Sequence, residues 1–121
     1  MRASGTQKLP RLVGKSTAKK LILFAEKVSA EEALRVNLVD FLADNFEDLE
    51  VVLQSKLDLL AKNGPIAIRA AKKAIEGGLS VDIETGLTIE NSCYQTVLNS
   101  KDRLEGLKAF SEKRTPVYQN K

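Results

Sequence analysis

The sequence predicts an all-α fold, and three observations support this. First, apolar residues recur every three or four positions over most of the chain, which is the period of an amphipathic helix. Second, helix starts and stops separate these stretches, with serine or asparagine before them and glycine or proline after them. Third, the apolar run 38–42 is too short for a helix, and we expect an extended connector or a single strand there. A succession of helices therefore leaves little room for a sheet.

Local signals give each predicted helix its limits. With their caps included, the predicted helices span residues 6–13, 16–28, 29–36, 45–63, 65–78, 80–98 and 100–115. The predicted N-caps are Ser16 or Thr17, Ser29, Asn45, Ser80 and Ser100. Ser29 forms a capping box with Glu32, and Pro65 suits the first turn of its helix. Gly14 and the pair Gly77 and Gly78 predict helix ends, as does Pro116 near the end of the chain.

Two of these helices carry clear apolar stripes. On the helix over 45–63, the stripe consists of Leu49, Val52, Leu53, Leu57 and Leu60. On the helix over 65–78, the residues expected on the buried side are Ile66, Ala70, Ala74 and Ile75. Each stripe needs an apolar surface to cover it, so we expect this chain to pack against further protein.

Composition excludes several kinds of chemistry. The chain has 121 residues, of which 43% are hydrophobic and 29% charged, and a net charge of +3. It has no histidine, which removes Ser-His-Asp and Cys-His catalysis and zinc sites built on imidazole. Its single cysteine, Cys93, excludes an internal disulfide and a multi-cysteine metal site. No stretch reaches the roughly 20 apolar residues that cross a bilayer.

Positive charge is concentrated at the start of the chain. Residues 1–25 hold six cations and no acid before Glu26. One interpretation is a mitochondrial transit peptide, and another is a folded motif. A nucleic-acid patch is disfavoured, because the cations lack interleaved aromatic residues and the overall charge is mild.

Several possible sites have simpler explanations. Gly14-Lys15-Ser16 lacks the upstream glycine of a phosphate-binding loop, since Leu9 stands there. The acidic pairs at 31–32 and 82–84 fall in first helical turns, where acids favour the helix dipole. Asp102 and Glu105 are interpreted in the same way. Cys93 lies within a helix, away from the N-terminus or base that would activate its thiol, so we expect it to pack as a small apolar residue.

A basic cluster near the end of the chain suits a nucleotide. Lys108, Lys113, Arg114 and Lys121 lie near two aromatic residues, Phe110 and Tyr118. An aromatic ring that stacks on a purine, beside cations that meet phosphates, fits an adenine nucleotide or coenzyme A. A solvated basic face explains the same spacing.

Five stretches together resemble one family. They are Gly5 to Gly14 (GTQKLPRLVG), Ser29 to Asp40 with the Ser-x-x-Glu-Ala and Leu-Val landmarks, Gly64 to Lys72 (GPIAIRAAK), Glu90 to Tyr94 (ENSCY), and Asp102 to Arg114 (DRLEGLKAFSEKR). Their order and spacing are similar to the second half of the crotonase (enoyl-CoA hydratase/isomerase) superfamily, closest to the subgroup of methylglutaconyl-CoA hydratase and mitochondrial enoyl-CoA hydratase domain proteins. Asn37 stands where that family usually has glycine, which suits a left-handed backbone.

The resemblance implies that catalysis and oligomerisation belong to different parts of the protein. Family members have a β-β-α spiral core, which binds acyl-CoA and holds an oxyanion hole and two catalytic glutamates, followed by a helical region that forms trimers or paired trimers. Those core elements would precede this sequence. We therefore expect residues 1–14 to be the remnant of the core-to-helix junction, with residues 1–4 in place of a glycine-rich approach segment, and residues 15–121 to be the helical trimerisation region.

By the same resemblance, Phe110, Lys113 and Tyr118 align with the edge that holds the adenine end of CoA. No catalytic residue and no metal ligand carries over, and acyl-CoA is expected as substrate with no further cofactor.

The predicted function is the C-terminal part of an enoyl-CoA hydratase-like protein. The parent would add water to a 2-enoyl-CoA in fatty acid or branched-chain amino acid breakdown, in mitochondria. This chain would supply oligomer contacts and one edge of the CoA site, and it would be inactive alone. The alternative is a non-enzymatic interaction module that assembles with full-length crotonase subunits.

Overall fold

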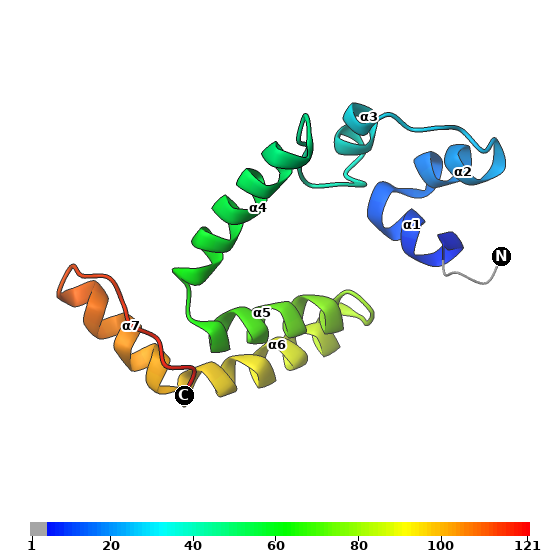
Figure 1. The fold of residues 1–121 in the computed structure, drawn as a ribbon. Helices are drawn as coiled ribbons and strands as arrows, with labels where there is room; N and C mark the ends of the chain where they lie inside the picture. The colour runs from blue at the N-terminus through cyan, green and yellow to red at the C-terminus, as the bar shows by residue number, and fades with distance from the viewer. Residues whose placement is uncertain (1–4) are drawn as a thin grey trace. The chain divides into compact units, whose positions relative to one another are not determined.

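The computed structural model describes residues 5–121, and these residues form seven α-helices and no strand (Figure 1). The helices are α1 (Gly5–Val13), α2 (Lys15–Leu23), α3 (Ala30–Arg35), α4 (Phe46–Ala61), α5 (Pro65–Gly78), α6 (Ile83–Leu98) and α7 (Lys101–Ser111). The prediction of an all-α chain is confirmed. The part of the predicted core-to-helix junction that precedes Gly5 lies outside the described residues.

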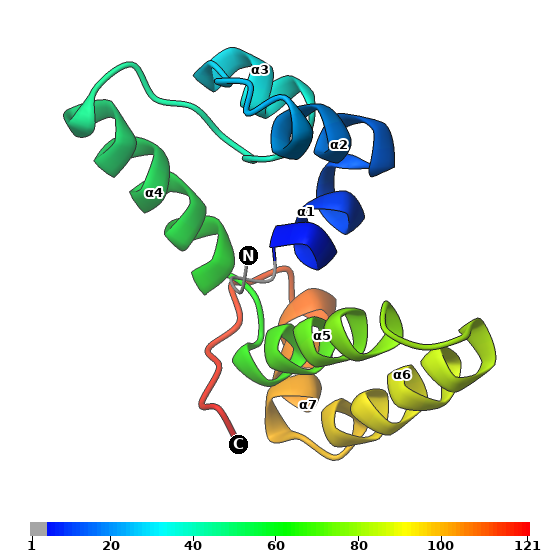
Figure 2. The same cartoon turned by 90° about the vertical axis from the view of Figure 1, so that its right-hand side faces the viewer.

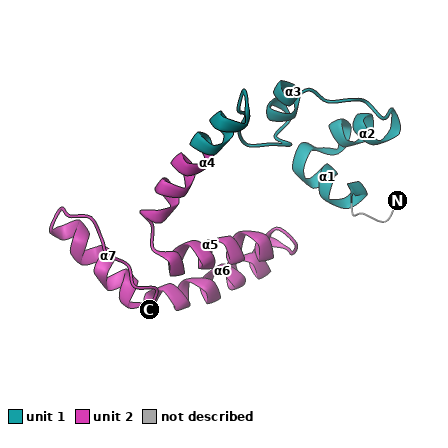
Figure 3. Ribbon diagram, viewed as in Figure 1, with its two compact units in different colours: residues 1–52 teal, residues 53–121 magenta. Residues whose placement is uncertain are grey.

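The chain divides into two compact units (Figure 3). The first comprises residues Met1–Val52 and the second Leu53–Lys121, so that the division falls within α4. The boundary predicted after residue 14, between a core-to-helix junction and a trimerisation region, stays a prediction.

In the first unit, one residue separates α1 from α2. Gly14 has φ +82°, a backbone conformation that suits glycine, and it occupies the N-cap of α2. The predicted caps Ser16 and Thr17 are therefore wrong, because both residues lie inside the helix. The helix also ends at Leu23 rather than Val28, and Ala25 follows in the left-handed region. Local periodicity did not reveal this early stop.

The helix α3 confirms two local predictions. The Ser29 hydroxyl accepts a hydrogen bond from the Glu32 N–H at 3.2 Å, although the Glu32 carboxylate binds Arg35 rather than completing a capping box. Asn37 has φ 58°, and its N–H donates to Leu34 O at 3.0 Å while Leu38 N–H donates to Ala33 O at 2.8 Å. These two bonds make a Schellman motif that ends α3. Residues 38–42 continue as a connector without strand structure.

The second unit is built on the α5–α6 hairpin. Both views show the two helices side by side (Figures 1 and 2), and glycines permit their close approach. A Cβ at Gly86 would lie 3.5 Å from the Cα of Gly78. Asp82 caps α6 by accepting from the Thr85 N–H at 3.0 Å, so the predicted cap Ser80 is wrong by two residues. The predicted caps of α4 and α7, Asn45 and Ser100, are correct.

The buried interior of the described residues contains small side chains. The buried apolar residues are Ala18, Ala33, Cys93 and Ala109. The leucines of the predicted α4 stripe remain about half exposed, and Ile75, predicted on the buried side of α5, is 62% exposed. Cys93 is buried within α6, as predicted. Among residues 5–121, no helix is long and apolar enough to span a membrane.

The left-handed backbone of Asn37 gives a direct test of this geometry. Replacement of Asn37 by Ala is expected to lower the free energy of unfolding by roughly 1 kcal/mol, because alanine is strained at positive φ. Replacement by Gly should leave it unchanged or raise it, since glycine adopts this conformation freely. Chemical denaturation followed by helical circular dichroism measures both effects, and equal stability of the Ala and Gly variants would contradict the assignment.

Candidate functional site

The helix α7 and the tail that follows it form the candidate site. The Ser100 hydroxyl accepts from the Arg103 N–H at 3.1 Å and begins the helix. A second Schellman motif ends it: the Arg114 N–H donates to Ala109 O at 3.0 Å, and the Lys113 N–H donates to Phe110 O at 3.2 Å. Lys113 takes the left-handed position with φ 53°. The helix therefore ends at Ser111, earlier than the predicted stop at Thr115.

Beyond this turn the tail runs back along α7, and Glu105 holds its first part. The Glu105 carboxylate accepts from Arg114 Nη1 at 2.5 Å, from Arg114 Nη2 at 3.0 Å and from the Val117 N–H at 2.8 Å. These donors, the Arg114 guanidinium foremost, lower the pKa of Glu105 to about 2, and the same contacts raise the pKa of Arg114. Glu105 is therefore a fixed carboxylate that orders the tail.

Asp102 holds the last part of the tail. It is 4% exposed, and its carboxylate accepts from the Gln119 N–H at 2.7 Å and from the Asn120 N–H at 3.0 and 3.1 Å. In return, the N–H groups of Lys101 and Asp102 donate to Lys121 O at 2.7 and 3.1 Å. The tail thus satisfies two of the N–H groups that a helix N-terminus leaves without an intrahelical partner.

The Tyr118 ring packs where two glycines leave room for it. A Cβ at Gly64 would lie 3.5 Å from Tyr118 Cε1, and a Cβ at Gly106 would lie 3.3 Å from the Tyr118 hydroxyl oxygen. Arg69 on α5 also donates a hydrogen bond to Asn120 Oδ1. Residues from α5, α7 and the tail therefore meet around this ring.

The structure places the predicted CoA-binding residues in two positions. Phe110, 86% exposed, and Lys113 lie at the C-terminal end of α7. Tyr118 lies beside Gly106, four residues or about 6 Å back along the helix axis from Phe110. Of the predicted basic cluster, Arg114 is bound to Glu105 and Glu112, and Lys108 lies 4.0 Å from Glu112. The assignment of Phe110, Lys113 and Tyr118 to CoA binding stays a prediction.

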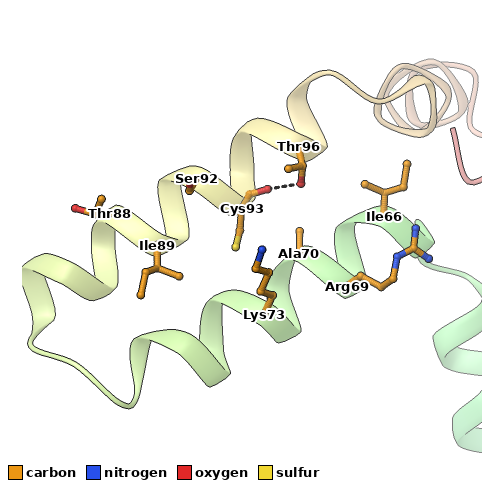
Figure 4. A pocket seen from close by; sticks show the side chains of 9 residues that line it. All are labelled: Ile66, Arg69, Ala70, Lys73, Thr88, Ile89, Ser92, Cys93 and Thr96. Carbon is orange, nitrogen blue, oxygen red and sulfur yellow. Dashed lines mark hydrogen bonds between the residues drawn. The ribbon is translucent and has the colours of Figure 1, made fainter.

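A groove of about 540 Å³ runs between α5 and α6 (Figure 4). Its lining residues are Ile66, Arg69, Ala70, Lys73, Thr88, Ile89, Ser92, Cys93 and Thr96. The Thr96 hydroxyl donates to the carbonyl oxygen of Cys93 at 2.6 Å. The groove combines apolar walls, hydroxyls and two cations on α5, but its lining residues include no carboxylate or imidazole to act as a general base.

The other carboxylates with shifted pKa values are structural. Hydrogen bonds from backbone N–H groups and Ser29 lower the pKa of Glu31, Arg35 lowers that of Glu32, and Thr85 lowers that of Asp82. A carboxyl group that acts as a general acid near neutral pH needs a raised pKa instead. Within residues 5–121, no cluster of three or more metal-ligating side chains is present.

In α1, two residues of the GTQKLPR stretch bind each other. Arg11 Nη1 donates to the Gln7 carbonyl oxygen at 2.8 Å and to Gln7 Oε1 at 3.2 Å. This stretch therefore forms a helix that is stabilised by hydrogen bonds between its own polar residues.

Comparison with known proteins identifies the family. A protein-family model described as enoyl-CoA hydratase/isomerase matches residues 1–121 of this chain. The chain is 46% identical to an Arabidopsis thaliana protein named "Probable enoyl-CoA hydratase 2, mitochondrial", over 96% of this chain and 38% of that protein. It is 44% identical to mitochondrial methylglutaconyl-CoA hydratase of Mus musculus, over 94% of this chain and 37% of that protein. The crystal structure of an enoyl-CoA hydratase from Bacillus anthracis has a TM-score of 0.93 and 48% identity, over 98% of this chain and 46% of that one.

The chain therefore belongs to the enoyl-CoA hydratase/isomerase family, as its five landmarks predicted. Its all-helical structure is consistent with the C-terminal helical part of a crotonase fold. It spans less than half the length of these relatives.

Sequence reasoning assigned Asp102 and Glu105 only to the start of a helix. The structure adds that both hold the tail, through contacts with residues 9 to 18 positions later in the chain. The available signal was the spacing in Asp102-Arg103-Leu104-Glu105-Gly106, which places two acids and a glycine within about one helical turn.

The lowered pKa of Glu105 predicts how stability depends on pH. Its ionised form is favoured in the folded chain, so its contribution is fully present above its ordinary pKa of 4.5 and is lost as the pH falls toward 2. The stability difference between the parent chain and Glu105→Gln should therefore be constant above about pH 4.5 and shrink below it. Urea denaturation over this pH range measures the difference, and a difference that grows on acidification would contradict this role.

Proposed function

We propose that this chain is the C-terminal helical part of an enoyl-CoA hydratase-like protein. In this proposal it supplies subunit contacts and one edge of the acyl-CoA site, while the groups that add water to the 2-enoyl-CoA lie in another part of the parent protein. The parent would act in the breakdown of fatty acids or branched-chain amino acids. The names of the mitochondrial relatives support a mitochondrial location.

One observation carries this proposal: a chain that matches enoyl-CoA hydratases along its whole length leaves most of its large apolar side chains exposed. Phe24, Phe46, Leu79, Ile83 and Phe110 are each more than 70% exposed. Full burial of such a side chain contributes about 1.5–3 kcal/mol. Exposed apolar surface on this scale favours a partner surface, whether a spiral core or neighbouring subunits.

The acyl-CoA edge is proposed at the C-terminal end of α7. Phe110 offers an exposed ring for stacking, and Lys113 offers a cation directly beyond it. Lys113 occupies a left-handed position that glycine would adopt at lower cost, so its side chain is present despite backbone strain.

The purified chain is expected to hydrate no crotonyl-CoA above background. Loss of the absorbance of the conjugated double bond measures the reaction, and a full-length enoyl-CoA hydratase serves as the positive control. A rate proportional to the concentration of this chain would contradict the proposal, because the proposal places the groups that add water in another part of the parent protein.

Substitution of Lys113 separates binding from stability. Lys113→Gly should raise the free energy of unfolding by roughly 1 kcal/mol, since glycine is unstrained at φ 53°. The same change should weaken crotonyl-CoA binding up to about fivefold, because an exposed ion pair contributes up to about 1 kcal/mol. Calorimetry measures the affinity, and Lys72→Ala, an exposed cation on α5, is the matched control for lost charge. An unchanged affinity of Lys113→Gly for crotonyl-CoA would contradict the assignment of Lys113 to the acyl-CoA site.

A second candidate function uses the same exposed surface without any chemistry. The chain would be an interaction module that assembles with full-length crotonase subunits and changes their oligomeric state. Sedimentation of labelled chain mixed with a full-length enoyl-CoA hydratase distinguishes the two, since a stable mixed species supports the module and separate species contradict it.

A further inference from the structure

The direction of α7 is weakly determined by its contacts with other helices. The helix follows α6 after two residues, Asn99 and Ser100, and then leaves the hairpin, so that the two helices meet only near this joint (Figures 1 and 2). A joint of two residues does not by itself fix the angle between helices. Another element must do so if the end of α7 is to have a defined position.

The tail supplies that restraint. Asp102 and Glu105 fasten it to α7 through backbone N–H groups, while Arg69 reaches it from α5 through Asn120 Oδ1. The tail is thus bonded to the hairpin and to α7 at the same time.

The Tyr118 ring fills the space between these elements. A Cβ added at Gly64, the residue before α5, or at Gly106, in the middle of α7, would lie within 4 Å of the Tyr118 ring, at 3.5 and 3.7 Å from Cε1 respectively. The ring also lines two hollows, one of about 610 Å³ beside Leu57 and Ile68 and one of about 230 Å³ beside Val97 and Asp102. Removal of the ring would enlarge both hollows and remove an apolar restraint on α7.

We infer that residues 116–121 form a strap that fixes α7 against the α5–α6 hairpin, and that Tyr118 is a positioning residue in it. The strap determines where Phe110 and Lys113 lie relative to the hairpin. The importance of that position rests on the proposed acyl-CoA edge, but the restraint itself does not depend on it. Tyr118 then acts through the orientation of α7 rather than by stacking on a ligand.

Distance measurements between the helices test the strap in the full chain. Spin labels at Lys72→Cys on α5 and Lys108→Cys on α7, in a Cys93→Ala background, report the separation by pulsed electron resonance. The labelled chain with Tyr118 intact and the labelled Tyr118→Phe variant should give the same single narrow distance, because both rings fill the space. Tyr118→Ala should lose it, and an unchanged narrow distance in Tyr118→Ala would overturn the inference. Tyr94→Ala, which removes an exposed ring on α6, is the matched control.

A double substitution tests the same contact without removing the ring. In Gly106→Ala the new Cβ lies 3.3 Å from the Tyr118 hydroxyl oxygen but 3.7 Å from Cε1. The single variant should therefore broaden the distance between the labels, and the double variant Gly106→Ala with Tyr118→Phe should restore it. Failure of this rescue would overturn the inference even if Tyr118→Ala fails to fold. A label pair within the hairpin, at Lys72→Cys and Gln95→Cys, checks that α5 and α6 remain packed.

Calorimetry with crotonyl-CoA on the same variants separates the two proposals. Absence of binding in the parent chain would contradict the acyl-CoA edge and leave the distance results to decide on the strap. Binding that is retained in Tyr118→Phe and lost in Tyr118→Ala, together with the altered distance, supports both.

Discussion

In each of the two compact units, the buried apolar positions of the described residues hold only small side chains, and this constraint shapes how the helices are held. Alanine and cysteine occupy the buried apolar positions, and glycines stand where helices or rings come closest. Small residues bring backbones together but bury little apolar area, and burial contributes roughly 25 cal/mol per Å². The chain therefore relies on caps, glycine contacts and hydrogen bonds to the tail, while most of its large apolar side chains stay exposed.

The polar contacts compensate for this where α7 meets the tail. Asp102 is nearly buried, yet its two oxygens accept from two backbone N–H groups, so its charge is placed where donors converge. Glu105 does the same for Arg114 and Val117 in a more exposed position. Within the described residues, no buried polar side-chain atom lacks a hydrogen-bond partner. For Glu105 these donors lower the pKa, which suits a carboxylate that holds the tail and not an acid catalyst.

This distribution of carboxylates agrees with the place of the chain in its family. The chain matches enoyl-CoA hydratases over less than half of their length, and the acids with shifted pKa values that it contributes serve caps, ion pairs and the tail. What it presents outward is apolar surface, together with an exposed ring and a cation at the end of α7. These features support the proposal that the chain completes a binding site and an assembly whose reacting groups lie in another part of the parent protein.

The sequence alone determined what depends on neighbours along the chain: the helical class, the caps at Ser29, Asn45 and Ser100, the left-handed Asn37, and the family landmarks. Its errors were also local, since Gly14 and Asp82 cap helices assigned to nearby serine or threonine residues. Only the tertiary structure showed that Asp102 binds residues 17 and 18 positions away, that Tyr118 lies close to two glycines, and that Ile75 stays exposed. Periodicity reports which side of a helix is apolar, but the partner of that side and the path of the tail are decided by contacts between distant residues.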